Sequence, residues 1–312
     1  RYGPHFFRTD EIAVWQYLSK FTEWHHYEHK VKSNVIGMEV PFPINLDTYN
    51  AIFNDNLTSI EFKRWLESNY FTDSPQNAEE SIINQVGEYL YELFFKNYTL
   101  KQWGQHPKEL KADTVRRVPV RVDRESRYQL SRYQGIPIHG YTHMIKKMIS
   151  NKNIHLMLNV DYKEVIDKFD FDFLIYTGPL DYFYDYKYGR LDYRSLKFKR
   201  KHFSKESYQS EAVINYPNNY DFTRITEYKK LTGQTHLGTT IHEEYPVSFV
   251  EGKNEPYYPI LNDRNLALKD KYLNEAKSEK NVIFIGRLAE YKYYAMDEVV
   301  EEALRVFLEK LS

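Results

Sequence analysis

Hydrophobic residues recur at helical spacing in three stretches of the first hundred positions. They predict a helix near residues 12–18, a second near 60–66 and a third that begins after Asn77. Asn77 followed by Glu80 three positions later is the pattern of a capping box. The third helix then has its apolar face at Ile82, Ile83, Val86, Leu90, Leu93 and Phe94. The second and third helices together predict a helical subdomain.

Alternating polar and apolar residues predict strands elsewhere. "VIGMEVPFPINL" (35–46) predicts a turn with short strands, and the alternating stretches between 190 and 250 predict an antiparallel sheet. "NIHLMLNVDYKEVIDKFDFDFLIYTGP" (153–179) predicts a strand, an acidic turn, a short helix or turn and a second strand, which is typical of an α/β sheet.

The closing segment "NVIFIGRLAEYKYYAMDEVVEEALRVFLEKL" (281–311) predicts a strand, an aromatic loop and a helix that begins near Met296. Asp297 and Glu298 fall in the first helical turn, where the helix dipole favours acids. The amides of that turn can also bind an anion or a polar cofactor atom, although a crossover that only packs is an equal alternative. We expect the apolar side of this helix to consist of Val299, Val300, Ala303, Leu304, Phe307 and Leu308.

Composition excludes several classes of site. The 43 Lys and Arg nearly balance the 44 Asp and Glu, so the net charge does not favour nucleic acid, even for the basic stretches 116–127 and 197–205. The absence of cysteine excludes disulfides, thiolate metal sites and a cysteine nucleophile, and it suits a reducing cytoplasm. No apolar run approaches the length of a membrane span, and no catalytic triad or metal motif stands out among the 11 histidines.

Aromatic and arginine residues supply the candidate chemistry. The chain holds 29 tyrosines, and "FFKNYTLKQWGQHPKEL" (94–110) places Tyr98, Thr99 and Trp103 on an expected loop, where they could stack on a base or simply close a core. Five arginines between 116 and 127 suit phosphate, although such a charge run is more often a solvated face. Arg224 lies in the middle of an expected strand, where its charge requires solvent or a buried anion.

These stretches resemble the UDP-galactopyranose mutase family of flavoenzymes. The matching motifs follow one order along the whole chain: "YGPHFFRT" (2–9), "VPFPIN" (40–45), "NAEE" (77–80), "YTLKQWG" (98–104), "RRVPVR" (116–121), "GYTHM" (140–144), "IYTGPLDYFYDYKYGRLDYRSL" (175–196), "TRITEYK" (223–229), "PYYPI" (256–260) and "GRLAEYKYYAMD" (286–297). The family's GxGxxG turn lies upstream of the "YGPH" loop and is absent here. We therefore expect that an N-terminal segment of roughly 50 residues is missing from this sequence.

The resemblance implies an α/β fold: an FAD-binding Rossmann-like domain, whose N-terminal part is missing, with an inserted helical subdomain and an antiparallel β-sheet domain. The expected FAD-binding domain is discontinuous and comprises 1–30, 135–180 and 262–312. The helical subdomain would be 45–112, and the sheet or substrate domain 31–44, 113–134 and 181–261.

The resemblance also implies roles for individual residues. Arg117 and Arg224 would be catalytic and clamp the diphosphate of a UDP-sugar. The expected substrate-binding residues are Arg8, His29, Phe94, Tyr98, Thr99, Trp103, Tyr128, Asn215, Tyr258 and Tyr293. The expected cofactor-binding residues are His5, Phe6, Arg287, Met296, Asp297, Glu298 and Val299.

The implied reaction interconverts the pyranose and furanose forms of UDP-galactose without net oxidation, through nucleophilic N5 of reduced FAD. The family also implies a homodimer, with no metal, nucleic acid or membrane partner. Two alternatives stay open: a flavin amine-oxidase-like oxidoreductase, which would consume oxygen, and a non-catalytic UDP-sugar-binding protein.

Two positions depart from the family's usual residues. Arg8 replaces a usual His, and members that also accept N-acetylated sugars carry Arg there, so UDP-N-acetylgalactosamine is a further expected substrate. Ala295 replaces an acid found in many members, so that contact is not carried over.

Overall fold

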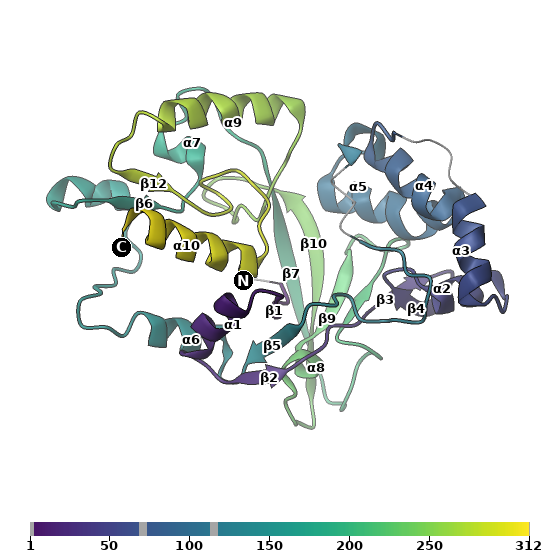
Figure 1. Ribbon diagram of the computed structural model, residues 1–312. Helices are drawn as coiled ribbons and strands as arrows, with labels where there is room; N and C mark the ends of the chain where they lie inside the picture. Colours follow the sequence, from purple (N-terminus) through teal and green to yellow (C-terminus); the bar gives the residue numbers. More distant parts are fainter. Residues whose placement is uncertain (1–2, 69–73, 113–117, 312) are drawn as a thin grey trace. The chain divides into compact units, whose positions relative to one another are not determined.

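A computed structural model describes residues 3–68, 74–112 and 118–311 of the chain (Figure 1). The chain forms two compact units. The first contains residues 1–6, 27–130 and 192–262, and the second contains 7–26, 131–191 and 263–312. Both units are therefore assembled from segments distant in sequence. The division into a cofactor domain, a helical subdomain and a sheet domain stays a prediction.

The first unit is built on a seven-stranded sheet in the order β11-β7-β10-β9-β8-β3-β4. Its strands are β3 (Val31–Val35), β4 (Met38–Phe42), β7 (Tyr193–Phe203), β8 (Val213–Asn215), β9 (Arg224–Glu227), β10 (Thr239–Ser248) and β11 (Tyr258–Pro259). The strand prediction for 190–250 is confirmed by β7, β8, β9 and β10, whose neighbouring pairs are all antiparallel.

The expectation of a purely antiparallel sheet is wrong at one position, because β3 and β8 run parallel. The predicted turn at Ile36 and Gly37 joins β3 to β4 as a tight antiparallel hairpin. Strand β8 comes about 180 residues later and is not constrained by a short turn, so it can lie beside β3 in the same direction. The sheet is therefore mixed.

Helices of the first unit follow in sequence after β4. They are α2 (Leu46–Phe53), α3 (Ser59–Ser68), α4 (Ala78–Tyr91), a π-helical turn η1 (Glu92–Lys96), α5 (Asn97–Trp103), a 3-10 turn η2 (Pro107–Glu109) and, between β9 and β10, α8 (Tyr228–Thr232). Ile82, Val86 and Leu90 of α4 are buried in one apolar core with Phe62 of α3 and the strands β3 and β4. This confirms the predicted apolar face and joins the helices to the sheet.

Asn77 is the N-cap of α4, as predicted, and its Oδ1 accepts a hydrogen bond from the Glu80 amide at 3.0 Å. Glu80 returns to the Gln76 amide at 2.8 Å rather than to the Asn77 amide. Asn77 and Glu80 therefore each accept a hydrogen bond from a backbone amide at the start of the helix. In an ideal capping box, Glu80 would accept from the Asn77 amide and not from the Gln76 amide.

The loop expected at Tyr98, Thr99 and Trp103 is helix α5, so that prediction is wrong. The chain turns at Gly87, whose φ is 78°, and then continues through the π-helical turn directly into α5. Gly104 ends α5 in the left-handed conformation, with its amide donating to the Leu100 carbonyl at 2.8 Å.

The second unit contains two small sheets. Strands β1 (Phe7–Thr9), β5 (Tyr133–Pro137) and β2 (Trp24–His26) form an antiparallel sheet in the order β1-β5-β2, and β6 (Leu174–Tyr176) pairs in parallel with β12 (Val282–Phe284). The helices are α1 (Ile12–Ser19), α6 (Gly140–Met148), the 3-10 turns η4 (Tyr162–Glu164) and η5 (Ile166–Lys168), α7 (Leu180–Phe183), α9 (Asp263–Ala276) and α10 (Met296–Lys310). Helix α10 packs on β1 and α1, as Figure 1 shows.

The first strand expected in 153–179 is not formed, whereas the second is β6. A strand requires a hydrogen-bonded neighbour, and among the described residues β6 pairs only with β12. The side chains of Ile154, Leu156 and Leu158 are accordingly exposed.

Helix α10 begins at Met296, as predicted, but the predicted buried side is wrong at its C-terminal end. Phe307 and Leu308 are exposed by 52% and 68%, whereas Val306 is buried with Ile283 and Ile285 around β12. Met296, Val300 and Leu304 pack instead on the α1 cluster. The helix therefore packs against two separate hydrophobic clusters with different sides, and not along a single apolar face.

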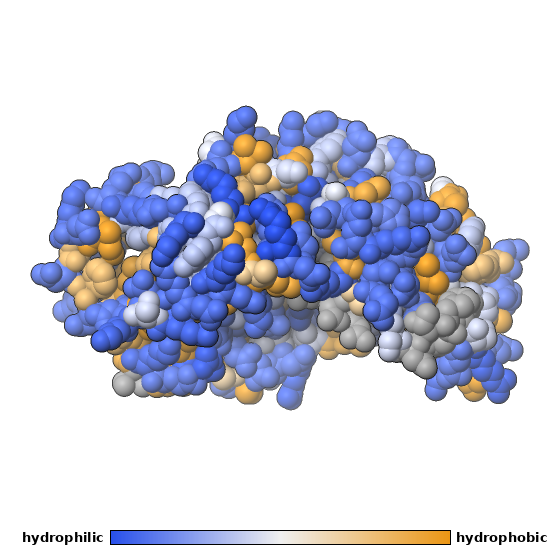
Figure 2. All heavy atoms as spheres, turned by 90° about the horizontal axis from the view of Figure 1, so that it is seen from above, coloured by the Kyte–Doolittle hydropathy of each residue, from blue (hydrophilic) through white to orange (hydrophobic). Residues whose placement is uncertain are grey.

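No helix in the described part of the chain is long and apolar enough to cross a membrane. Within those same residues, no group of three or more His, Cys, Asp and Glu side chains could hold a metal ion. On the face shown in Figure 2, hydrophobic residues form small patches separated by hydrophilic ones.

Candidate functional site

Arg224 is the centre of a polar cluster on one face of the seven-stranded sheet. Sheet register places it opposite Asn215 on β8 and opposite Glu244 on β10. Its Nη2 donates a 2.6 Å hydrogen bond to the Tyr98 hydroxyl of α5. Register and this hydrogen bond therefore bring together three of the predicted residues, Arg224, Asn215 and Tyr98.

Arg224 is the first residue of β9 and not a mid-strand residue, so that expectation is wrong, but Glu244 is the buried anion that was expected beside its charge. Its Oε1 lies 3.4 Å from Arg224 Nε, and its side chain is only 4% exposed. Burial acts to lower the pKa of Arg224, but the Glu244 carboxylate and, to a smaller extent, Tyr98, Tyr258 and Tyr128 together raise it well above the usual value. The guanidinium is therefore a permanent cation, partly exposed and available for an anionic ligand.

Helix α5 carries three of the predicted substrate-binding residues, Tyr98, Thr99 and Trp103. Thr99 is buried and Tyr98 is half-buried, and burial raises the pKa of Tyr98 to about 12 despite the opposing effect of Arg224. Tyr98 therefore stays a neutral phenol at working pH. Trp103 at the end of α5 meets Tyr258 of β11 edge to face, with ring centroids 6.3 Å apart.

His29 forms a second cluster with rings from three segments of the first unit. The Phe6 ring lies 4.4 Å from the His29 ring, and Tyr128 meets His29 edge to face at 5.7 Å. His29 Nδ1 lies 2.8 Å from the Tyr27 hydroxyl, in hydrogen-bond contact. Burial, aided by the charge of Arg224, lowers the pKa of His29 to about 3, so the imidazole is neutral.

Phe94 and His5 lie at opposite extremes of exposure. Phe94 is buried in the helical core and stacks with Phe42 at 6.2 Å between centroids. His5 is exposed, with its Nδ1 2.8 Å from the Gly3 carbonyl oxygen. Their predicted roles at substrate and cofactor stay predictions.

In the second unit, the segment after β12 brings several predicted residues together. The Arg287 guanidinium lies over the Tyr293 ring, 4.7 Å from its centroid, and its Nη2 donates to the Tyr294 carbonyl. The Ala295 amide donates to Glu298 Oε2 at 2.5 Å, which caps the start of α10. The acid that Ala295 lacks is therefore not needed to begin the helix.

Arg8 and Asp297 are neighbours in this unit, with Arg8 Nη1 4.0 Å from Asp297 Oδ2. Burial raises the pKa of Asp297, and Arg8 counteracts that rise. Asp297 Oδ1 is buried without a hydrogen-bond partner among the described residues. The side chain of Arg8 on β1 thus reaches the first turn of α10.

The start of α10 has features suited to a flavin. A 15-residue helix leaves the amides of its first turn without helical partners, and the unpartnered Asp297 oxygen lies in that turn. Gly286, which follows β12, has a φ of 95° and open space where a Cβ would be. Met296, Asp297 and Glu298 therefore fit the cofactor-binding role that the resemblance implies. The Val299 amide already donates to the Ala295 carbonyl at 3.2 Å, so the role of Val299 stays a prediction.

Arg117 lies outside the described residues. Among its described neighbours in the arginine-rich stretch, Arg121 donates to the Glu125 carbonyl and Arg127 forms an ion pair with Glu28 at 3.0 Å. These two arginines therefore stabilise the fold of 121–128 rather than forming an open phosphate patch.

Three residues important to this geometry were missed by the sequence analysis: Glu244, Lys101 and Arg194. Arg194 donates from Nε to the Gln102 carbonyl at 2.9 Å and from Nη2 to the Lys101 carbonyl at 3.1 Å, at the C-terminal end of α5. The alternation of β10 could have indicated that Glu244 shares a face with Arg224, but only the register identifies it as the partner.

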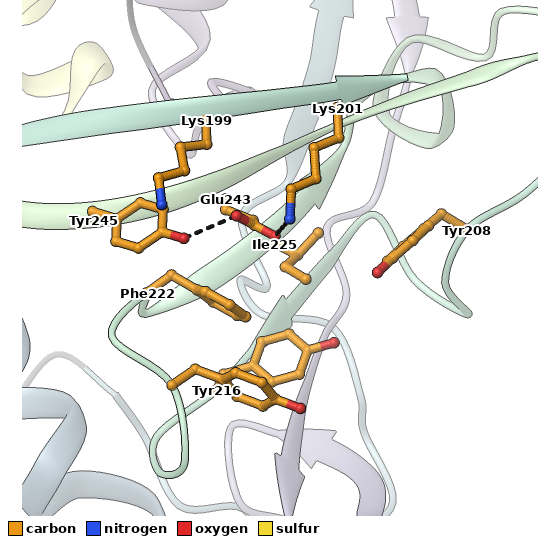
Figure 3. A pocket seen from close by; sticks show the side chains of 9 residues that line it. Lys199, Lys201, Tyr208, Tyr216, Phe222, Ile225, Glu243 and Tyr245 are labelled. Carbon is orange, nitrogen blue, oxygen red and sulfur yellow. Dashed lines mark hydrogen bonds and ion pairs between the residues drawn. The ribbon is translucent and has the colours of Figure 1, made fainter. Parts of the chain in front are cut away.

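A pocket of about 380 Å³ opens on the other face of the same sheet (Figure 3). Glu243, adjacent to Glu244, lines it and pairs with Lys201, while Lys199 lies 4.4 Å from the centre of the Tyr245 ring. Tyr216 and Phe222, from the connection between β8 and β9, line its other side. Because successive side chains of a strand point to opposite faces, this pocket is separated from Arg224 by the sheet.

Comparisons with known proteins identify the family of this chain. Residues 93–293 match the family model described as UDP-galactopyranose mutase. A probable UDP-galactopyranose mutase of Klebsiella pneumoniae is 40% identical over all of this chain and 81% of its own length. A dTDP-fucopyranose mutase of Escherichia coli is 34% identical over 97% of this chain and 82% of its own length.

The fold also has a counterpart among solved structures. A crystal structure of reduced UDP-galactopyranose mutase superposes with a TM-score of 0.73 at 17% identity and covers 99% of this chain and 84% of that one. At that identity the likeness shows the fold alone, and the family rests on the sequence matches. The chain therefore belongs to the UDP-galactopyranose mutase family.

Proposed function

We propose that this protein interconverts UDP-galactopyranose and UDP-galactofuranose with reduced FAD as its cofactor. The observation that supports this most directly is the Arg224 cluster in a chain that belongs to the mutase family. Arg224 is a permanent cation on a sheet face, hydrogen-bonded at 2.6 Å to Tyr98 of the helix that also carries Thr99 and Trp103. A diphosphate requires such a cation, and an adjacent aromatic helix suits a nucleobase.

The proposed substrate roles follow from this arrangement. Arg224 binds the diphosphate and neutralises charge as UDP leaves, with Arg117 as the second clamp. Tyr98, Thr99 and Trp103 surround the uridine, whereas Asn215, Tyr128 and Tyr258 complete the pocket with His29. His29 is neutral, so it can accept a hydrogen bond from a sugar hydroxyl or donate one to it. It does not add positive charge.

The proposed cofactor roles belong to the second unit and the N-terminal loop. Arg287 and the first turn of α10 would hold the flavin. The roles of His5 and Phe6 at the flavin stay predictions from the resemblance. When bound, reduced FAD supplies a nucleophilic nitrogen, N5, for the anomeric carbon of the sugar. The protein would orient the sugar and balance charge. Tyr293 lies under the Arg287 guanidinium, and its role at the substrate stays a prediction from the resemblance.

We further propose that UDP-N-acetylgalactosamine is accepted, because Arg8 replaces the usual histidine. Arg8 is 31% exposed in its side chain and is only loosely paired with Asp297 at 4.0 Å. Its guanidinium therefore retains donors for the carbonyl of an acetamido group.

The family match favours a mutase over a flavin amine-oxidase-like enzyme or a silent UDP-sugar-binding protein. The name of the dTDP-fucopyranose mutase relative shows that nucleoside and sugar can differ among similar chains. The nucleotide sugar is therefore the part of the proposal that most needs a direct test. A homodimer stays a prediction from the resemblance, and a cytoplasmic location stays a prediction from the absence of cysteine.

The test is to incubate the protein with FAD, dithionite and either UDP-galactose or dTDP-fucose, and to separate pyranose from furanose products by chromatography. We expect a furanose product from UDP-galactose, no product without dithionite, and no stoichiometric consumption of reductant. A furanose product from dTDP-fucose alone would replace the proposed substrate. No isomerisation of either sugar, with flavin bound and reduced, would overturn the proposed activity.

A further inference from the structure

Lys101 has an unusual environment for a lysine on a short helix. Its Nζ lies 2.6 Å from the Tyr216 carbonyl oxygen, 2.9 Å from that of Tyr220 and 3.0 Å from that of Phe222. An ammonium has three N–H donors, so the three carbonyls can satisfy it completely. All three acceptors belong to residues 216–223, which connect β8 to β9 and are called the β8–β9 connection below.

The β8–β9 connection joins two residues of the candidate site. Asn215 ends β8 immediately before it, and Arg224 begins β9 immediately after it. The connection is closed by the Tyr216 amide, which donates to the Thr223 carbonyl at 2.8 Å. A shift of this connection would therefore move both Asn215 and Arg224.

Lys101 lies on α5 between the residues that are proposed to surround the uridine. Tyr98 and Thr99 precede it by one turn or less, and Trp103 follows two positions later. Two further contacts join the same regions: Asn97 Nδ2 donates to Asn218 Oδ1 at 2.8 Å, and Asn218 Nδ2 donates to the Leu93 carbonyl at 3.0 Å. The Lys101 contacts are the charge-assisted ones of this set and are expected to be the strongest.

The Lys101 ammonium has all its hydrogen bonds, but burying its charge still costs free energy. Burial lowers the pKa of Lys101 to about 8, and the charge of Asp221 acts in the opposite direction. A neutral apolar side chain would avoid that cost, so packing alone does not explain a lysine here.

We propose that Lys101 is a positioning residue that holds the β8–β9 connection against α5, so that Arg224 and Asn215 meet Tyr98, Thr99 and Trp103 in one binding geometry. Lys101 does not itself contact substrate in this role. This inference rests on the proposed function for its consequence, UDP binding, but the clamp can be measured separately.

The experiment compares the wild type with Lys101→Met in the full chain. Amide hydrogen exchange of residues 216–223 measures the clamp, and calorimetric titration with UDP measures its consequence. We expect faster exchange in the connection and a UDP dissociation constant raised about tenfold, since three charge-assisted hydrogen bonds are removed. Flavin binding should be unchanged.

Lys199→Met is the matched control. It makes the same chemical change beside Tyr245, in the pocket that Tyr216 and Phe222 line from the other side (Figure 3). Lys199 donates no hydrogen bond to residues 216–223 in the described structure. Exchange and UDP affinity should both stay at wild-type values. A control that behaves like Lys101→Met would overturn the inference, because any lysine near the connection would then suffice.

A chemical rescue separates the charge from mere packing. The chain has no cysteine, so Lys101→Cys introduces a single thiol. Alkylation with 2-bromoethylamine restores an ammonium at nearly the original length, whereas iodoacetamide adds a neutral amide. We expect the aminoethylated protein, and not the carbamidomethylated one, to recover UDP affinity, and this comparison also decides the question if Lys101→Met does not fold.

Three results overturn the proposal: unchanged exchange in Lys101→Met, faster exchange with UDP affinity within twofold of wild type, or equal rescue by both alkylating agents. If the wild type binds no UDP, the proposed function fails instead. Exchange in the β8–β9 connection then still decides whether Lys101 holds it.

Discussion

Arg224 and Tyr98 are joined by a hydrogen bond of 2.6 Å, although they lie 126 residues apart. One comes from the second strand of a hairpin and the other from a short helix that follows a π-helical turn. This bond holds a positively charged guanidinium next to an aromatic ring in the candidate site. The proposed diphosphate and uridine positions are therefore linked by one direct contact.

Arg224→Ala is expected to reduce turnover strongly while flavin stays bound. Loss of a charge-assisted contact costs about 1.5–3 kcal/mol, or roughly 10- to 150-fold in kcat/KM. The variant should also unfold at a lower temperature, because Glu244 is left buried without its cation. The double variant Arg224→Met/Glu244→Gln should recover stability but not activity. Wild-type kcat/KM in either variant would refute the proposed role of Arg224.

Tyr98→Phe should weaken UDP binding moderately, because it removes the hydroxyl that accepts from Arg224 and keeps the ring. We expect a loss of about 1 kcal/mol, measured as the UDP dissociation constant by calorimetry. Tyr89→Phe, at an exposed tyrosine of α4, is the control and should bind UDP as the wild type does. Equal affinities in both variants would mean that the Arg224–Tyr98 contact is not part of the binding site.

Arg8→His should change substrate preference. Histidine cannot offer the five donors of arginine to an acetamido carbonyl, so activity on UDP-N-acetylgalactosamine should fall far more than on UDP-galactose. The measurement is the ratio of kcat/KM for the two sugars. Arg64→His, the same change at an exposed arginine of α3, is the control and should keep the wild-type ratio. An unchanged ratio in Arg8→His would remove the basis for the second substrate.

His29 should make the protein less stable in acid. Its pKa is about 3 when folded, against 6.5 for the ordinary group, because burial disfavours the charged form. The unfolded chain therefore binds a proton between these values that the folded chain does not, and stability is lost as pH falls below 6.5. Between pH 7.5 and 5 this loss should be smaller in His29→Gln by about 2 kcal/mol in urea unfolding. His26→Gln, at an exposed histidine, is the control, and an identical pH dependence in all three proteins would contradict this account.

Gly104→Ala should destabilise the first unit more than Gly37→Ala does. Both glycines have positive φ, 68° and 80°, but only at Gly104 would a Cβ lie 2.9 Å from Arg194 Nη1. Arg194 is bonded to the last carbonyls of α5 and cannot move without breaking those bonds. We expect about 1 kcal/mol for the backbone at both sites and a further loss at Gly104 alone. If both variants lowered the unfolding temperature equally, the Arg194 side chain would be able to move away from the new Cβ without cost.

The local pattern of the sequence determined where several elements begin and which family the chain resembles. Asn77 starts α4 and Met296 starts α10 because caps and apolar periodicity depend on residues within one or two turns. The alternating stretches between 190 and 250 form strands for the same local reason. The motifs and their order along the chain identified the family, and the sequence matches confirm it.

Tertiary structure decided which residues meet. Only sheet register places Glu244 beside Arg224, and only the approach of α5 brings Lys101 to three carbonyls some 120 positions away. It also decided that β3 and β8 are parallel and that 153–160 does not form a strand, because pairing depends on partners distant in sequence. Hydrogen bonds and ion pairs between distant segments leave no periodic signal in the sequence, so the site's supporting residues became visible only in the folded chain.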